Sequence, residues 1–194
     1  MLLLVIGLIV FLGIHLVPTN PELRNGLVEK LGEAKWKAIF SVVSLVGFAL
    51  IIYGYHKLQV MPGKNPQLWD PPAWTRHAAW ALMLPSMVLL VAAYVPSRIR
   101  DVVRHPMLLA TKLWALAHLL ANGDAASVAL FGSFLAYAVY DRISVKQRAG
   151  AGLGPLGARS GGLGGDVLVL VLGIALYAFM LHMGHLLLIG VPVM

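Results

Sequence analysis

The sequence contains no cysteine and few charged residues, and each shortage excludes a class of protein. Without cysteine the chain has no disulfide, no iron–sulfur cluster, no thiolate ligand for haem and no cysteine nucleophile. Only 12% of the 194 residues are charged and 59% are hydrophobic, against about 25% and 45–50% in soluble domains. The composition therefore excludes a soluble fold and predicts an integral membrane protein.

Catalytic acids are also scarce. The acidic residues all fall in predicted loops or at helix ends, and no Ser-His-Asp order, carboxylate pair or HExxH spacing is present. Hydrolysis and metalloprotease chemistry therefore have no support in the sequence.

The apolar residues form segments close to the helical length that a bilayer requires. We expect a single domain over residues 1–194, an all-α polytopic membrane bundle of about six transmembrane helices. The Asn122-Gly123-Asp124 stretch predicts a tight turn between the fourth and fifth helices. The first segment lacks a basic start and a cleavage pattern, so we expect a retained helix. The predicted spans are Met1–Val17, Trp36–Tyr55, His77–Val95, Pro106–Ala121, Ala125–Tyr140 and Val167–Val191.

The basic residues predict the orientation. With six spans, the loops at 18–35, 96–105 and 141–166 share one side, and the other loops and both termini share the opposite side. Lysine and arginine concentrate on the first side, which predicts that it is cytoplasmic and that the N and C termini lie outside the cytoplasm. The net charge of +7 is thus mostly topological, and the expected partner is the lipid bilayer, with no nucleic acid. The first set holds Arg24, Lys30, Lys35, Lys37, Arg98, Arg100, Arg104, Arg142, Lys146, Arg148 and Arg159, and the second Lys57, Lys64 and Arg76.

Two connecting segments have distinctive compositions. The loop at 18–35 alternates apolar and charged residues at helical spacing, so it is either an amphipathic surface helix or a solvated connector. The segment 149–165 is rich in glycine and predicts a flexible cytoplasmic linker.

Seven histidines stand out in so apolar a chain, because ionisable groups inside a membrane usually face the bundle interior with a partner. His118 shares a helix face with Thr111, Ala115 and Asn122, and the spacing of three places His182 and His185 on one face. Neutral imidazole is a good ligand for haem iron or copper. The alternative for each histidine is a hydrogen-bonded contact between helices.

Lys112 lies near the histidine-bearing face of the fourth segment. Three interpretations stay open for it: an ion pair with Asp124 or Asp141, a contact with a haem propionate, or a side chain that extends to the membrane surface.

Four stretches together resemble the NnrU family, and the resemblance covers essentially the whole chain. The run from Arg104 to Asp124 is the most specific of them. The stretches are Phe11-Leu12-Gly13-Ile14-His15, Pro71-Pro72-Ala73-Trp74-Thr75-Arg76-His77, Arg104-His105-Pro106-Met107 with Lys112-Leu113-Trp114-Ala115-Leu116-Ala117-His118-Leu119-Leu120-Ala121-Asn122-Gly123-Asp124, and Leu188-Ile189-Gly190-Val191-Pro192.

The resemblance implies a multi-pass protein of the bacterial inner (plasma) membrane that is associated with denitrification, in nitrite and nitric oxide metabolism. The family is similar to the plastid zeta-carotene cis-trans isomerase, a membrane enzyme that uses haem b. This similarity implies haem b held by His15 and His118, with a further histidine matching His56. The isomerase has a cysteine where this chain has Ala115, so no exchange of ligands through a thiolate is available here.

The helix arithmetic offers a rival ligand pair. At 1.5 Å per residue His118 lies roughly 20 Å above the predicted cytoplasmic face and His15 only about 5 Å above it. The alternative partner of His118 is therefore His182 or His185.

Three functions follow as hypotheses. In the first, the protein binds haem b and acts in redox or isomerisation chemistry, with an apolar molecule such as a carotenoid or quinone, or a denitrification enzyme, as partner. There His56 or His105 assists, and Arg76, Arg104 or Lys112 neutralises the propionates. The second is a non-enzymatic membrane module, a small-solute carrier or an assembly partner of respiratory enzymes. The third is a methyltransferase-like enzyme with a site at Arg104 and His105, because Arg-His-Pro also looks like a motif of isoprenylcysteine methyltransferase-like enzymes.

Overall fold

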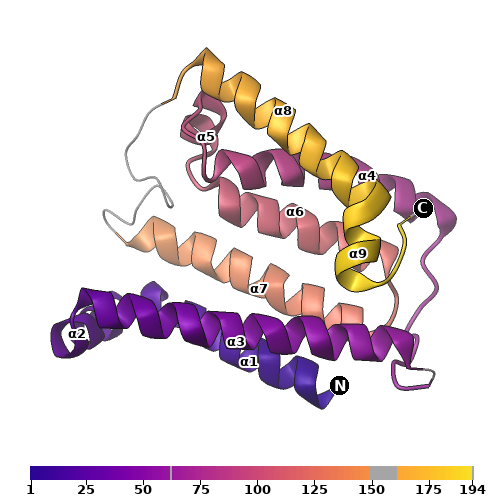
Figure 1. The fold of residues 1–194 in the computed structure, drawn as a ribbon, viewed down its shortest axis with the longest axis horizontal. Helices are drawn as coiled ribbons and strands as arrows, with labels where there is room; N and C mark the ends of the chain where they lie inside the picture. The colour runs from indigo at the N-terminus through magenta and orange to yellow at the C-terminus, as the bar shows by residue number, and fades with distance from the viewer. Residues whose placement is uncertain (62, 149–160, 194) are drawn as a thin grey trace.

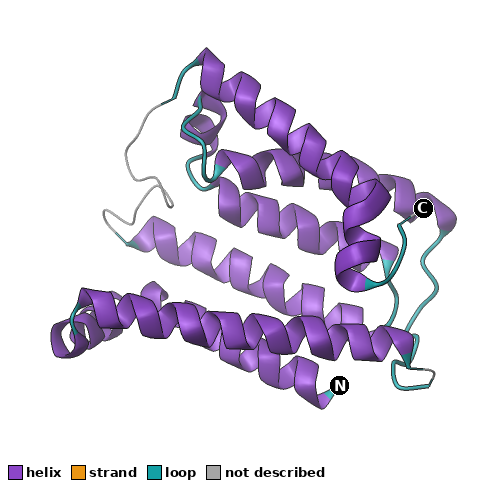
Figure 2. Cartoon of the chain, viewed as in Figure 1, coloured by secondary structure: helices purple, strands orange, loops and turns teal. Residues whose placement is uncertain are grey.

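The structure is a computed structural model that describes residues 1–61, 63–148 and 161–193. In this part of the chain the regular secondary structure is helical (Figure 2), and Gln67 and Asp124 form an isolated β-bridge. The predicted all-α fold is confirmed. In chain order the elements are α1 (Leu2–Leu16), η1 (Val17–Thr19), α2 (Pro21–Leu31), α3 (Glu33–Val60), α4 (Ala73–Ala92), α5 (Arg98–Val103), α6 (Pro106–Ala121), α7 (Ala125–Gln147), α8 (Leu163–Phe179), η2 (Met180–Gly184) and α9 (His185–Ile189).

Each predicted span corresponds to a helix. Five helical stretches are long and apolar enough to cross a membrane, and α6 is a shorter apolar helix of 16 residues. Two boundaries are corrected: the second span extends over the whole of α3, and the last is interrupted by η2, a π-helix. Most residues of each long span are not buried inside the protein, so their apolar side chains face outward, as lipid contact requires.

The connecting segments gather at two ends of the bundle (Figure 1). One end, here called the basic end, holds α2, α5 and the last turns of α7. The other, here called the terminal end, holds both termini, the 61–72 loop and the turn at 122–124 (Figure 1). The loops that the sequence assigned to one side therefore do lie together.

Helices α1 and α3 approach closely because glycine occupies their contact points. The helices run antiparallel, with Leu4 beside Gly54 and Phe11 beside Gly47. A Cβ atom on Gly54 would lie 2.6 Å from the backbone nitrogen of Leu4, and one on Gly47 would lie 2.7 Å from that of Phe11. Only a residue without a side chain fits, which is the small-residue packing typical of membrane helices.

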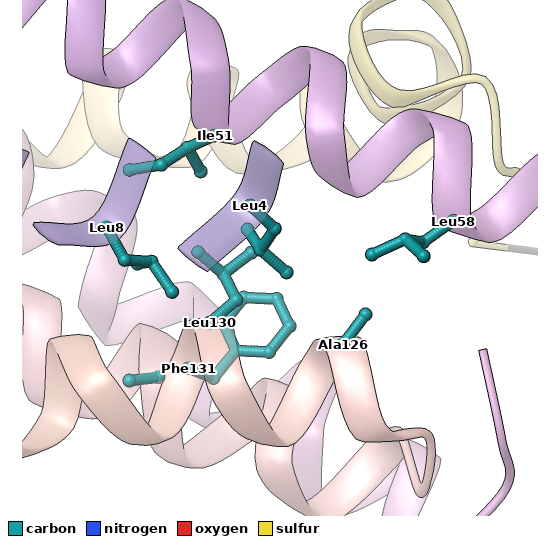
Figure 3. Close-up of a cluster of buried hydrophobic side chains, with 8 residues drawn as sticks. Leu4, Leu8, Ile51, Leu58, Ala126, Leu130 and Phe131 are labelled. Atoms are coloured by element: carbon teal, nitrogen blue, oxygen red, sulfur yellow. The ribbon is translucent and has the colours of Figure 1, made fainter. Parts of the chain in front are cut away.

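The central core joins this helix pair to α7. The side chains of Leu4 and Leu8 point toward Leu130 and Phe131 of α7, and Ile51 of α3 lies beside them (Figure 3). On the other side of α7, α6 packs between α7 and α4. Ser86 of α4 donates its hydroxyl hydrogen to the carbonyl of Ala110 of α6 at 2.9 Å.

Helix α5 was missed by the sequence analysis, which placed it in a loop. It is short, and its first turn is held by a residue far along the chain: the Asp166 carboxylate of α8 accepts from the backbone nitrogens of Arg98 and Ile99, and also binds the Arg98 side chain. The Ser97 hydroxyl oxygen caps the same turn by accepting a hydrogen bond from the backbone nitrogen of Arg100. Such a helix depends on tertiary contacts, so its own sequence gives little signal.

The two segments of distinctive composition have different outcomes. Within 18–35 the helix α2 forms, capped by the Asn20 side chain, so the helical alternative is confirmed. Of the predicted linker, residues 149–160 lie outside the described residues. Its last residues belong to α8, which begins at Leu163, and a Cβ on Gly165 would lie 2.0 Å from the carbonyl oxygen of Pro96. That glycine is therefore required by packing.

The close approach of α1 and α3 predicts the effect of a larger residue. Gly54→Leu is expected to lower the stability of the detergent-solubilised protein by about 1–3 kcal/mol or more, because its side chain would overlap the α1 backbone. Thermal unfolding followed by tryptophan fluorescence measures the change. Gly13→Leu is the matched control, since a Cβ there meets nothing within 4 Å. An equal loss of stability in Gly54→Leu and Gly13→Leu would contradict the requirement for glycine at the contact between α1 and α3.

Candidate functional site

A cavity lies among α3, α4, α6, α7, α8 and the η2–α9 segment. Its volume is about 480 Å³, within the range of small-molecule sites. Trp80, Met87 and Phe131 give it apolar walls, whereas Gln59, Arg76 and Asn122 supply polar groups. An apolar chamber with a few polar groups suits an amphipathic molecule with an anionic part.

Two histidines, His118 and His185, face this cavity. His118 belongs to the last turn of α6, and His185 is the first residue of α9. Their ring centroids are 6.2 Å apart, and the ring planes differ by 16°. The structure thus brings together one predicted ligand, His118, and one of its rivals, His185.

The hydrogen bonds of these rings fix their tautomer. His118 Nδ1 lies 2.8 Å from the carbonyl oxygen of Trp114, and His185 Nδ1 lies 2.7 Å from that of Val191. A carbonyl oxygen only accepts, so Nδ1 carries the hydrogen in each ring. In a neutral imidazole this leaves Nε2 with a free lone pair, the arrangement found in metal-binding histidines.

His15 lies elsewhere, near the C-terminal end of α1. Its ring stacks on Phe11, with centroids 4.2 Å apart, and meets Phe40 and Tyr137 edge-on. Helix α1 runs toward the basic end and α6 runs away from it (Figure 1). The structure therefore does not bring His15 to His118, although His15 Nδ1 also donates to a carbonyl, that of Phe11, at 2.6 Å.

His56 lies at the rim of the cavity. Its Nδ1 donates to the carbonyl of Ile189 at 3.0 Å, and Ile189 lines the cavity. Gly190 follows with φ +82°, and a Cβ there would lie 3.1 Å from His56 Cε1. His56 thus fixes the turn that leads the C-terminal segment over the cavity.

The π-helix separates the two histidines of the last span. The sequence analysis placed His182 and His185 on one helix face, and the structure corrects this. The wider turn of η2 changes the spacing, so that His185 lines the cavity whereas His182 is exposed. Such π-helical turns occur often at functional sites.

The predicted cationic residues separate into two groups. Arg76 lines the cavity, near the start of α4. Arg104, His105 and Lys112 lie on the α5–α6 corner and the first turns of α6, toward the basic end. The two acids proposed for Lys112 have other partners: Asp141 binds Arg148 at 2.7 Å, and Asp124 belongs to a polar network at the terminal end.

Asp124, which the sequence analysis placed in a tight turn and offered as a partner of Lys112, organises this network. Its Oδ1 accepts from Asn65 Nδ2 at 2.6 Å and from the backbone nitrogen of Ser127 at 2.9 Å. Ser127 Oγ donates to Oδ2 at 2.6 Å and lies 2.9 Å from the Tyr55 hydroxyl, which borders the cavity. The spacing of Asp124 and Ser127 at the start of α7 is a capping pattern that the sequence could have revealed.

The hydrogen bonds also determine the charge of this carboxyl group. Partial burial alone would raise the pKa of Asp124, but the hydrogen bonds from Ser127 and Asn65 hold it below its usual value. The carboxylate therefore stays ionised at neutral pH and secures the 61–72 loop to α7.

Comparison with known proteins identifies the family. The family model described as NnrU protein matches residues 3–193. The chain belongs to the NnrU family. No curated protein and no solved structure matches it.

Three of the four stretches that resemble NnrU proteins border the cavity of this NnrU-family chain. Arg76 comes from the stretch before α4, His118 and Asn122 from α6, and Ile189 from the last stretch. The remaining one, residues 11–15, contributes none of the cavity-lining residues. These stretches thus supply 9 of the 22 residues that line the cavity.

The Asp124 network predicts a pH-dependent stability of the NnrU-family protein. Asp124→Ala is expected to cost about 1–3 kcal/mol at pH 7, because it removes a helix cap and leaves buried donors unpaired. Since the native pKa of Asp124 is depressed, this stabilisation is complete above the unfolded pKa of about 3.9 and is lost as the pH falls through the native pKa.

Thermal unfolding in detergent between pH 7 and pH 3 measures the difference. The difference in unfolding temperature between the native protein and Asp124→Ala should become smaller below about pH 4. Asp70→Ala, an exposed acid in the same loop, is the control and should change little. A difference in unfolding temperature that does not change with pH would contradict the role of the ionised Asp124 carboxylate.

Proposed function

We propose that this NnrU-family membrane protein binds haem b in its cavity, with His118 and His185 as the axial ligands. The observation that supports the proposal is the pairing of two imidazoles across the cavity, each with Nδ1 held by a backbone carbonyl. When bound, haem supplies one-electron chemistry whose potential depends on its axial ligands.

The number of ligands favours haem over a bare metal ion. Among the described residues no group of three His, Cys, Asp or Glu side chains could hold a metal ion. Two protein ligands suffice when a macrocycle provides four more. Two imidazoles that share one iron have ring centres roughly 6 Å apart, because each metal–nitrogen bond is about 2 Å and each nitrogen lies about 1 Å from its ring centre. The centroid separation of 6.2 Å agrees with this value, but the rings lie stacked, so both imidazoles would have to turn their Nε2 atoms toward the iron when haem binds.

The remaining walls fit the same molecule. Phe131 stacks on His118 with centroids 4.4 Å apart, and Trp114 lies 5.4 Å from it, so aromatic surface surrounds the ligand and orients the imidazole. The Arg76 guanidinium on the lining can neutralise a propionate. Tyr55 and Gln59 add hydrogen-bonding groups, and the apolar residues exclude water.

With His118 and His185 holding its iron, haem would supply one-electron chemistry, which favours a role in electron transfer. We infer that the protein acts in the bacterial inner membrane as a redox partner in nitrite and nitric oxide metabolism. The family resemblance supports that assignment. Isomerase-type chemistry on a carotenoid or another apolar molecule stays a second prediction.

A non-enzymatic role has a separate observation in its favour. His56 and His185 both donate to carbonyls of the C-terminal segment, at Ile189 and Val191. These bonds fasten that segment over the bundle and would do so without any cofactor. In this case the histidines serve structure alone, in a carrier or assembly partner.

The absorption spectrum of purified protein distinguishes these functions. Protein produced with ample haem should give a pyridine haemochrome spectrum of haem b, and His118→Ala and His185→Ala should each lose most of the bound haem. His182→Ala, an exposed histidine three residues from His185, is the matched control. His15→Ala should also keep its haem.

Other results select other interpretations. Loss of haem in His15→Ala and His118→Ala but not in His185→Ala would establish the His15–His118 pair that the resemblance implies. Absence of haem from the native protein, with a lowered unfolding temperature in His185→Ala, would support the purely structural role.

A further inference from the structure

The basic end carries a cluster of cations that the haem proposal does not use. Arg104 and His105 form the corner between α5 and α6, Lys112 follows in the second turn of α6, and Arg142 and Lys146 lie in the last turns of α7. Helices α6 and α7 are packed neighbours joined by the turn at 122–124, so the start of one lies beside the end of the other (Figure 1). Residues far apart in sequence therefore meet at one place.

The charges of these residues act on one another. Arg142 and Lys146 both exert electrostatic effects on Lys112. Burial, followed by the charge of Arg142, holds the pKa of His105 below its usual value. Like charges held this close repel unless an anion lies between them.

Three acids at this end form ion pairs with other cations, and Glu22, Glu29 and Asp101 lie at the same end in α2 and α5. Asp141 binds Arg148 at 2.7 Å, Asp166 binds Arg98, and Glu33 binds Lys37 at 2.8 Å. Arg148 is further fixed by a bond to the carbonyl of Pro18 at 2.6 Å. Positive charge thus remains in excess around Lys112 and Arg142.

The helix faces that bear these cations also expose large apolar side chains. On α6, Leu109, Lys112 and Leu116 follow a spacing of three and four, which places them on one face, and the two leucines are 38% and 40% exposed. On α7, Val139, Arg142 and Lys146 follow the same spacing, with Ile143 beside them and 52% exposed. The α7 face is therefore apolar toward the membrane interior and cationic toward its end, whereas on α6 Lys112 lies between two exposed leucines.

We propose that this cluster binds an anionic phospholipid, with the headgroup phosphate between Lys112, Arg142 and Lys146 and the acyl chains along the exposed faces of α6 and α7. Basic pockets between transmembrane helices bind such headgroups. The adjacent apolar faces favour a lipid over a soluble phosphate, because a soluble anion has nothing to place on Leu116 or Val139. The site lies toward the basic end, whereas His118 and Arg76 of the cavity lie toward the terminal end, and it does not depend on haem.

Native mass spectrometry of the full chain in neutral detergent tests the proposal. The probes are phosphatidylglycerol and phosphatidylcholine with identical acyl chains. The native protein should prefer phosphatidylglycerol, and the double variant Arg142→Gln, Lys146→Gln should reduce that preference roughly tenfold. The control variant Lys57→Gln, Lys64→Gln removes the same charge at the terminal end and should keep the preference.

Additional measurements keep the result interpretable. Lys146→Gln alone changes an exposed residue and should fold normally, yet it should still reduce the preference, whereas Arg142→Lys should retain it. Equal losses in the cluster and control variants, or no preference in the native protein, would overturn the proposal. Displacement of the lipid by millimolar inorganic phosphate, with equal binding of both lipids, would indicate a site for soluble anions and overturn it as well.

Discussion

Within a bilayer, a polar group has to find its hydrogen-bond partner inside the protein, because lipid offers none. Four of the seven histidines of this chain obey that constraint through one repeated bond, from Nδ1 to a backbone carbonyl. His15 and His118 use the carbonyl four residues earlier in their own helix, and His56 and His185 use the C-terminal segment. The bond leaves Nε2 as the reactive nitrogen in each neutral ring. The same hydrogen bond thus gives each ring a partner inside the protein and leaves Nε2 of His118 and His185 available to bind a ligand.

Glycine controls where the bundle is tight and where it is open. Gly47 and Gly54 let α3 press against α1, and Gly173 lets α8 press against α4, where its Cβ would lie 2.6 Å from the Cα of Val88. Helices α6 and α7 have no such contact between them, because α6 contains no glycine and a Cβ on Gly132 of α7 would meet nothing within 4 Å; large aromatic side chains such as Trp80 and Phe131 line the cavity there. Two closely packed helix pairs therefore leave a chamber between them. A cavity in a bundle this small requires rigid walls, and the glycine contacts provide them.

Hydropathy and charge predicted the architecture but only part of the site. The six apolar helices and the grouping of their loops follow from lengths and lysine and arginine positions, since the bilayer imposes both. The shared face of His118 and Asn122 follows from their spacing of four. The sequence analysis offered His182 or His185 as the alternative partner of His118, but it could not choose between them, because the choice depends on the π-helix at Met180–Gly184. Helix α5 could not be predicted from its own sequence, because its first turn is held by Asp166, 68 residues beyond Arg98.

The shortness of α6 has a consequence for the surrounding lipid. Its 16 residues reach about 24 Å along the helix axis, against a hydrocarbon core of about 30 Å. The bilayer has to thin beside this helix, or its ends have to be covered by neighbours, and each missing ångström costs a fraction of a kcal/mol. Since α6 bears both His118 and Lys112, the thinning would occur where the two proposed ligands bind. Thinning beside α6 would make the protein favour membrane regions that are locally thin.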